Sequence, residues 1–143
     1  MEVLVKRHSP MAKRIPDSLK PHILPFNWDV RQVWALATPA VRVVRCQYDY
    51  LLDLPLWSSV QGCGMLFDIS PMAVIRDPAA SPYQTGRIAQ TDICHPLDFL
   101  LYGGHSWILD GVHRLAKHHI LGSETIMARF HPPTQIPIIR LGE

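Results

Sequence analysis

Charged residues are scarce in this chain: they make up 18% of its 143 residues, and the formal net charge is only +2. So small a positive excess does not predict nucleic-acid binding unless the basic residues form a patch. No run of about 18 apolar residues occurs. Residues 1–20 also lack the apolar stretch of a signal peptide. We therefore expect a soluble, cytoplasmic protein that has no membrane-spanning segment.

Cysteine is also rare, with three residues that lie far apart in the sequence. No Cys-x-x-Cys pair occurs, which argues against a zinc ribbon and against a thioredoxin-like motif. Unpaired cysteines suit a reducing compartment, where they are usually small core residues. Histidines are more frequent, but His113, His118 and His119 lack the i, i+4 spacing of a helical zinc pair. We therefore predict no protein metal site.

Hydrophobic residues make up 48% of the chain, which favours a packed globule over disorder. The length suits one domain. We predict a basic, proline-bounded N-terminal arm over residues 1–26 and a single domain over residues 27–143. The basic residues of the arm are Lys6, Arg7, Lys13, Arg14 and Lys20. Two interpretations of the arm stay open, a solvated tail and a contact for an acidic protein partner.

Thirteen prolines divide the rest of the chain into short segments. The patterns predict helices over 28–36, 48–54, 71–76 and 112–121, with one more opened by Ser81-Pro82. Strands are predicted over 41–46, 65–69, 97–102, 105–109 and 125–130, with an edge strand over 136–139. Asn27 is expected to cap the first helix, with Trp28, Val33 and Trp34 on its apolar face. This mixture predicts an α+β fold, a small mixed sheet with short helices on one face.

The most informative segment is 108–117, where a strand leads through a glycine into a helix. Before it, Gly103-Gly104 joins two apolar runs, a spacing typical of a β-hairpin. Asp110 is placed to cap the helix, and Gly111 lets the backbone come close to whatever lies there.

The start of this helix is a candidate phosphate site. A helix N-terminus carries unpaired N–H groups and the positive end of the helix dipole, so it attracts anions. His113 and Arg114 lie in the first turn and add two side-chain donors, and a neutral, structural His113 is the alternative that stays open. Cations at a positive helix end are unfavourable unless an anion joins them, which favours binding over an ordinary surface position.

The segment Asp-Gly-Val-His-Arg at 110–114, followed by Leu-Ala-Lys, resembles the nucleotide-site motif of the ParB/sulfiredoxin superfamily. In that family a hairpin strand leads into Gly-x-x-Arg at the start of a helix, and a further strand follows a glycine turn. Leu121-Gly122-Ser123-Glu124 fits that turn. The resemblance covers about residues 65–130, and it implies a ParB/sulfiredoxin-like fold.

Differences from the family motifs distinguish its branches. Sulfiredoxins carry Gly-Gly-Cys-His-Arg with the cysteine as nucleophile, whereas Val112 stands at that place here. Partitioning ParB proteins carry Gly-Glu-Arg-Arg and a DNA-binding helical domain, for which the sequence after Arg114 is too short. Kinases of the superfamily that act on free serine carry Asp-Gly-His-His-Arg, and only Val112 differs from that motif. The kinase-like branch is the nearest by motif.

The resemblance assigns roles to two sets of residues. Those expected to bind nucleotide or phosphate are Gly111, Val112, His113, Arg114 and Arg87. Asp110 is the first candidate for a catalytic base or metal-phosphate ligand, and Asp68 and Asp92 are the alternatives. Capping alone would explain Asp110, and ordinary surface ion pairs would explain Arg87 and Asp92.

The leading functional hypothesis is a nucleotide- or phosphate-binding ParB-like domain. As an enzyme it would be an ATP- or ADP-dependent kinase that transfers phosphate to a small hydroxylated acceptor. Its cofactor would be a nucleoside triphosphate or diphosphate with magnesium. The alternative is a non-catalytic nucleotide-binding or protein-interaction module. A ParB-like DNA-associated protein ranks third, because neither a helix-turn-helix pattern nor a basic stripe is present.

Overall fold

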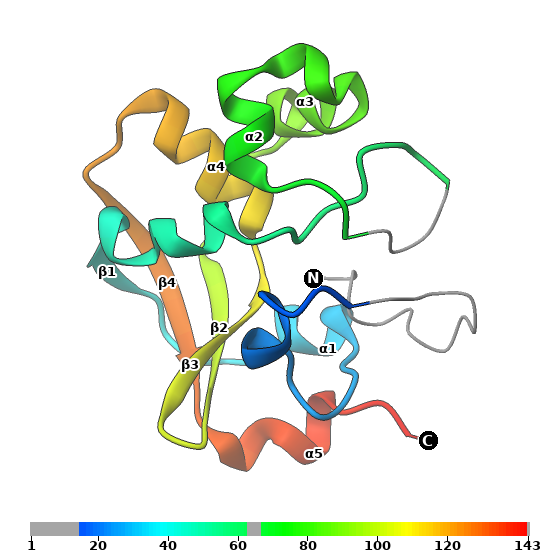
Figure 1. Ribbon diagram of the computed structural model, residues 1–143. Coiled ribbons are helices and arrows are strands. Elements are labelled where there is room, and N and C mark those ends of the chain that lie inside the picture. The colour runs from blue at the N-terminus through cyan, green and yellow to red at the C-terminus, as the bar shows by residue number, and fades with distance from the viewer. Residues whose placement is uncertain (1–14, 63–66, 143) are drawn as a thin grey trace.

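The computed structural model describes residues 15–62 and 67–142, which form a four-stranded sheet with short helices (Figure 1). The strand order is β1-β4-β2-β3. β1 (Val41–Val44) pairs antiparallel with β4 (Thr125–His131), and β4 pairs in parallel with β2 (Leu97–Tyr102). β3 (His105–Asp110) is the antiparallel partner of β2. The predicted small α+β fold with a mixed sheet is confirmed.

The hairpin between β2 and β3 forms where the Gly-Gly pair predicts it. Gly103 has φ +60° and Gly104 has φ +83°. Positive φ at both central residues is what the tight two-residue hairpin turn requires, and glycine adopts it without steric cost. This turn fixes the register of β3 and therefore the place where the strand ends.

The described part of the chain forms five short α-helices. They are α1 (Val30–Trp34), α2 (Pro71–Arg76), α3 (Pro82–Gln90), α4 (Val112–Leu121) and α5 (Ile136–Ile139). A 3-10 helix, η3 (Arg45–Asp53), follows β1. Figure 1 shows α2, α3 and α4 gathered above one end of the sheet, with α1 and α5 near the other. Within the described residues, no helix has the length and apolar character that crossing a membrane requires.

The two faces of the sheet differ in chemistry. On one face Phe99 of β2 stacks on Phe130 of β4, with ring centroids 5.1 Å apart, and Tyr48 of η3 packs on Phe99. The opposite face carries Asp98 and its register partner Arg129. One face is therefore an aromatic core, whereas the other holds charged groups under the α1 segment.

Two helix starts confirm the Ser-Pro prediction. The hydroxyl of Ser70 accepts a hydrogen bond from the Ala73 N–H at 3.1 Å, and that of Ser81 accepts one from the Gln84 N–H at 3.1 Å. In both helices proline follows the cap, where its missing N–H costs nothing.

Two predicted strands are wrong. Residues 136–139 form the helix α5, because Pro137 lies in its first turn and Ile139 turns into the core. Of the predicted strand 65–69, residues 65 and 66 lie outside the described part. The remainder forms only one bridge, between Ile69 and Trp57, and Phe67 has φ +51°. A backbone in that conformation cannot continue a strand.

The N-terminal part of the chain differs from the prediction in two ways. The first helix is capped by Asp29, whose carboxylate accepts the Arg31 N–H at 3.0 Å, and not by Asn27. Within the predicted arm, Leu19, Leu24 and Phe26 are buried core residues. The packed unit therefore begins before the predicted boundary at residue 27, and residues 1–14 of the arm lie outside the described part.

Candidate functional site

The candidate site begins at the tight junction between β3 and α4. Gly111 separates the two elements with φ +118°, a conformation that L-residues rarely adopt. A Cβ at this position would lie 2.9 Å from Leu97 Cγ and 3.2 Å from Leu97 Cα. Glycine is therefore required here for conformation and for space, and the backbone of the turn lies directly against β2.

Within residues 15–62 and 67–142, no side chain caps the N-terminus of α4. Asp29, Ser70 and Ser81 each cap their helix with a side-chain hydrogen bond, whereas the N-cap of α4 is Gly111, which has no side chain to make such a bond. The first backbone bond into the helix runs from the Leu115 N–H to the Gly111 carbonyl at 2.9 Å. The N–H groups of residues 112–114 therefore have no acceptor within the helix.

The predicted capping role of Asp110 is wrong. Asp110 is the last residue of β3, one position before the N-cap of α4, which is Gly111. Its Oδ2 accepts hydrogen bonds from Trp34 Nε1 at 2.8 Å and from Arg114 Nη2 at 3.1 Å. Burial alone would raise the pKa of Asp110, but the positive charge around it, that of Arg114 included, and the hydrogen bonds from these two donors lower it. The group is an anion at neutral pH.

Arg114 lies across the turn and is mostly buried, with 15% of its side chain exposed. Its Nη2 donates to the Pro96 carbonyl at 3.1 Å as well as to Asp110. Its Nε is buried and has no hydrogen-bond partner among the residues that the structure describes. A guanidinium has five N–H donors, so these contacts use only part of its capacity.

His113 is held by two neighbours. Its ring stacks on Trp57, with centroids 4.2 Å apart and planes at 13°. Its Nε2 lies 2.7 Å from Gln84 Oε1, and Gln84 Nε2 donates to the Ser58 carbonyl. Because the Gln84 side chain turns its oxygen toward the ring, we assign the proton of the neutral imidazole to Nε2, which donates it to Gln84 Oε1.

The electrostatics of His113 agree with this arrangement. Burial, and next the positive charge of Arg87, lower its pKa from 6.5 to about 3. A neutral ring that already donates its one N–H cannot donate a second to a phosphate oxygen. The structure therefore gives His113 a positioning role between α3 and α4.

Arg87 is an exposed residue of α3 whose charge acts on His113. Its guanidinium carbon lies 5.8 Å from the centroid of the Tyr83 ring. In the described part of the chain it forms no ion pair. It is thus a cation near the turn that remains available to a ligand.

The other two candidate carboxylates lie outside the turn. Asp68 accepts two hydrogen bonds from Ser59, from its N–H at 2.7 Å and from its hydroxyl at 2.6 Å. Asp92 is exposed beyond α3, where the N–H of Cys94 lowers its pKa. Both carboxylates close local loops, and the structure brings only Asp110 into contact with Arg114.

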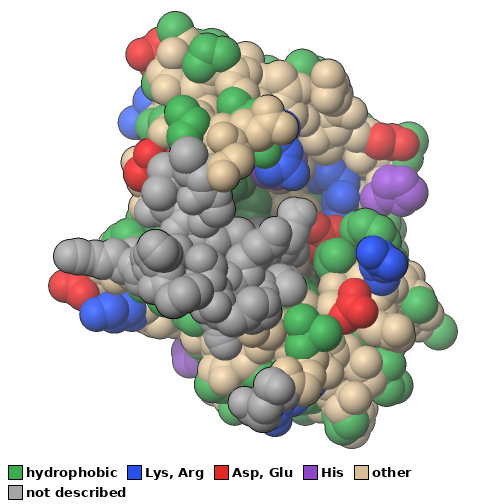
Figure 2. Space-filling view, turned by 90° about the vertical axis from the view of Figure 1, so that its right-hand side faces the viewer, with side chains coloured by type: hydrophobic (Ala, Val, Ile, Leu, Met, Phe, Trp, Pro, Cys, Tyr) green, Lys and Arg blue, Asp and Glu red, His purple; other side chains and the backbone are tan. Residues whose placement is uncertain are grey.

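The space-filling view shows a hollow on one face of the molecule (Figure 2). Lys or Arg side chains and an acidic side chain line it.

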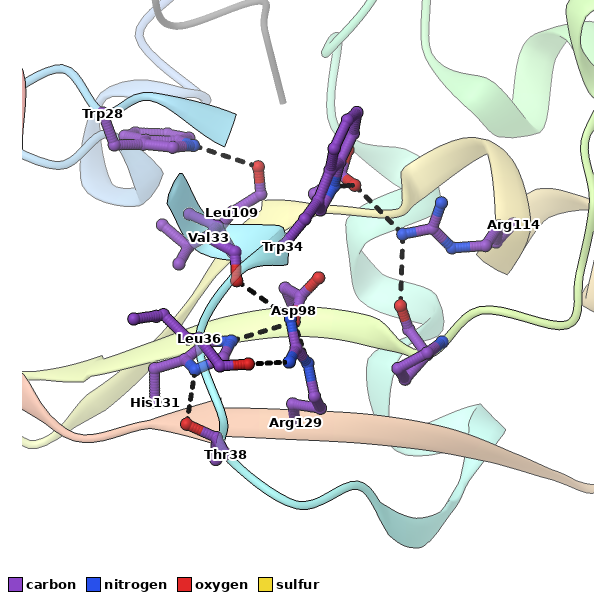
Figure 3. Close-up of polar contacts among 12 residues, drawn as sticks. Trp28, Val33, Trp34, Leu36, Thr38, Asp98, Leu109, Arg114, Arg129 and His131 are labelled. Carbon is purple, nitrogen blue, oxygen red and sulfur yellow. Dashed lines mark hydrogen bonds and ion pairs between the residues drawn. The ribbon is translucent and has the colours of Figure 1, made fainter. Parts of the chain in front are cut away.

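Beneath α1, a buried charged network supports the site (Figure 3). Asp98 Oδ1 accepts from Arg129 Nε at 2.7 Å and lies 2.8 Å from His131 Nε2. The opposite nitrogen of His131 lies 2.7 Å from the hydroxyl of Thr38. Arg129 also donates to the carbonyls of Val33 at 3.0 Å and Leu36 at 2.7 Å.

This network fixes the end of α1, and sequence analysis missed it. The segment that it holds carries Trp34, whose indole donates to Asp110. Trp34 was predicted on the apolar face of α1, yet it is 57% exposed, whereas Trp28 is fully buried. A signal for the network did exist: Asp98 is a carboxylate inside an otherwise apolar strand, where a charge needs a partner.

Metal ligands do not gather at the site. Among the described residues, no three His, Cys, Asp or Glu side chains lie close enough to hold a metal ion. Magnesium at nucleotide sites is commonly held by one or two carboxylates together with the phosphates. The carboxylate of Asp110 fits such a partial contribution.

Comparisons with known proteins gave no relative. The chain matches no protein-family model, no curated protein and no solved structure. The resemblance of residues 110–114 to the ParB/sulfiredoxin motif therefore stays a prediction from the sequence.

Proposed function

We propose that this protein binds the phosphate groups of a nucleotide at the start of α4. The observation that carries the proposal is the uncapped first turn of α4 beside a partly unsatisfied Arg114. N–H groups without acceptors and a guanidinium together favour a multiply charged anion. The exposed Arg87 adds a second cation, and the motif resemblance supports a nucleotide.

The roles of the candidate residues follow from their contacts. The backbone N–H groups of Val112, His113 and Arg114 would donate hydrogen bonds to phosphate oxygens, and Gly111 would allow the close approach. The side chain of Val112 is buried, so this residue contributes its backbone only. The side chain of His113 holds the turn through Gln84 and does not touch phosphate.

Phosphoryl transfer to a small hydroxylated acceptor is the reaction that the proposal includes. Because its pKa is lowered and its carboxylate holds two donors, Asp110 is a weak proton acceptor. It is better suited to orient Arg114 and to contribute an oxygen to the magnesium that accompanies the nucleotide, which would neutralise phosphate charge. A cytoplasmic location, where such nucleotides are available, belongs to the same proposal.

The alternative is a module that binds nucleotide without turning it over. The tight engagement of Asp110 by Trp34 and Arg114 favours this alternative, because no carboxylate at the turn is left as a ready base. Binding is common to both versions, and only catalysis separates them.

A ligand panel tests the proposal. Pyrophosphate, tripolyphosphate, ATP and ADP are added with and without magnesium, and the melting temperature is measured. A ligand at about 100 times its dissociation constant adds about 2.7 kcal/mol to the free energy of unfolding, so binding is readily detected. Failure of all four ligands to raise the melting temperature contradicts the proposal.

Turnover is then measured with the nucleotides that bind. Loss of ATP on addition of serine, glycerol or other small alcohols supports the kinase version. Binding without turnover for every acceptor supports the non-catalytic module.

A further inference from the structure

We propose that the exposed indole of Trp34 is the surface on which the base of the bound nucleotide stacks. This inference rests on the proposed phosphate site, and it names the other half of the ligand. It predicts that the site prefers a nucleotide with a large aromatic base, a purine, over an inorganic polyphosphate.

The exposure of Trp34 sets it apart from two other tryptophans. Trp34 is 57% exposed, whereas Trp28 is fully buried and Trp57 is 4% exposed. An indole is the largest aromatic side chain, and leaving it in water forgoes the free energy of its burial. A planar ligand group stacked on the ring would recover this free energy.

Although it is exposed, the Trp34 ring is anchored. Its Nε1 donates to Asp110 Oδ2 at 2.8 Å. The carbonyls on either side of it, those of Val33 and Leu36, are both held by Arg129, which is paired with the buried Asp98. A surface that is already ordered loses little conformational entropy on binding.

The position of Trp34 joins an aromatic surface to a positive one. Trp34 Nε1 and Arg114 Nη2 bind the same oxygen of Asp110, so the edge of the indole and the guanidinium are neighbours. Figure 3 shows Trp34 and Arg114 side by side at this point. A ligand that carries both a planar ring and an anionic group matches this pair, and a nucleotide has both.

The experiment compares two ligands on a set of Trp34 variants. Dissociation constants for ATP and for tripolyphosphate are measured by calorimetry. Trp34→Phe keeps an aromatic ring but loses the N–H that Asp110 accepts. Trp34→Gln keeps an amide donor but loses the ring. Because Trp34 is exposed, both variants are expected to fold, and a melting curve of each checks this.

Loss of the indole ring is expected to weaken the binding of ATP and not that of tripolyphosphate. Trp34→Gln should weaken ATP binding by about 5- to 150-fold, the range for one stacked base, and leave tripolyphosphate binding within about twofold. Trp34→Phe should retain most of the ATP affinity. ATP should also quench tryptophan fluorescence in the natural protein, and this quenching should be lost in both variants.

Other outcomes overturn the inference. Equal weakening of both ligands by Trp34→Gln, or no weakening of either, would show that Trp34 does not contact the base. If tripolyphosphate binds the natural protein as tightly as ATP does, the base adds nothing to the affinity. The stacking inference then fails, while the phosphate proposal stands. If neither ligand binds the natural protein, the phosphate proposal fails, and this inference fails with it.

Discussion

Gly111 and Leu97 are in such close contact that no side chain fits between them. A Cβ on residue 111 would lie 2.9 Å from Leu97 Cγ, and the φ of +118° is itself unfavourable for any other residue. Leu97 begins β2 and Gly111 joins β3 to α4, so this contact sets where the helix starts relative to the sheet. The N–H groups of the candidate site therefore depend on it.

Gly111→Ala is expected to destabilise the fold. Backbone strain of about 1–3 kcal/mol, added to the clash with Leu97, should lower the free energy of unfolding by at least that amount. Urea denaturation measures the change. Gly86→Ala is the matched control, because a Cβ there meets nothing within 4 Å and Gly86 lies inside α3. It should stabilise the protein by about 0.5–1 kcal/mol.

The pair of substitutions tests the geometry of the turn. If Gly111→Ala is as stable as Gly86→Ala, the junction does not have the tight conformation described.

The Asp98–Arg129 pair should couple strongly. Arg129→Met leaves Asp98 buried with its charge less well compensated, and Asp98→Asn does the same to Arg129, so each should cost about 3–5 kcal/mol of unfolding free energy. The double variant should cost clearly less than the sum of the two, because it leaves no unpaired charge. Urea denaturation of the natural protein, the two single variants and the double variant gives the coupling energy of the pair, as in a double-mutant cycle. Additive costs would show that the pair does not interact in solution.

Stability should fall on acidification because of His113. Its pKa is about 3 when folded and 6.5 in the reference state, so the unfolded chain alone binds the proton between these values. The contribution of the neutral His113 to the free energy of unfolding is complete above pH 6.5. Between pH 6.5 and pH 3 it is lost as the pH falls, at about 1.4 kcal/mol per pH unit.

His113→Gln isolates this effect, since glutamine does not titrate. The difference in unfolding free energy between the natural protein and the variant should shrink steadily below pH 6.5. A difference that is constant from pH 7 to pH 4 would mean that His113 titrates normally in the folded protein.

Turn and cap residues in the sequence predict the elements that position the site. The Gly-Gly turn, the two Ser-Pro caps and the glycine after α4 fix their own backbone conformations, and Gly122 indeed ends the helix with φ +75°. Each of these depends on neighbouring residues only, so the sequence reveals it. The confirmed hairpin and helix start are of this kind.

Contacts between segments far apart in the sequence determine the features that the sequence does not predict. Asp110 misses the helix cap because it pairs with Trp34, 76 positions away. His113 is uncharged because Trp57 and Gln84 enclose it, and nothing in its own segment indicates this. The β-branched residues of Ile136–Ile139 predict a strand, yet this segment forms a helix with Ile139 in the core. In each case tertiary packing outweighs local preference.

The most direct test of the phosphate site is a calorimetric titration of tripolyphosphate into three proteins. The natural protein and Arg42→Ala should bind it alike, because Arg42 lies on β1, at the opposite edge of the sheet from β3. Arg114→Ala should weaken binding by about 10- to 150-fold, the loss of one charged hydrogen-bonding partner. Arg114→Lys, which keeps the charge, should lie between them, and a melting curve shows that each variant is folded. Equal binding by Arg114→Ala and Arg42→Ala, or no binding by the natural protein, would contradict the account.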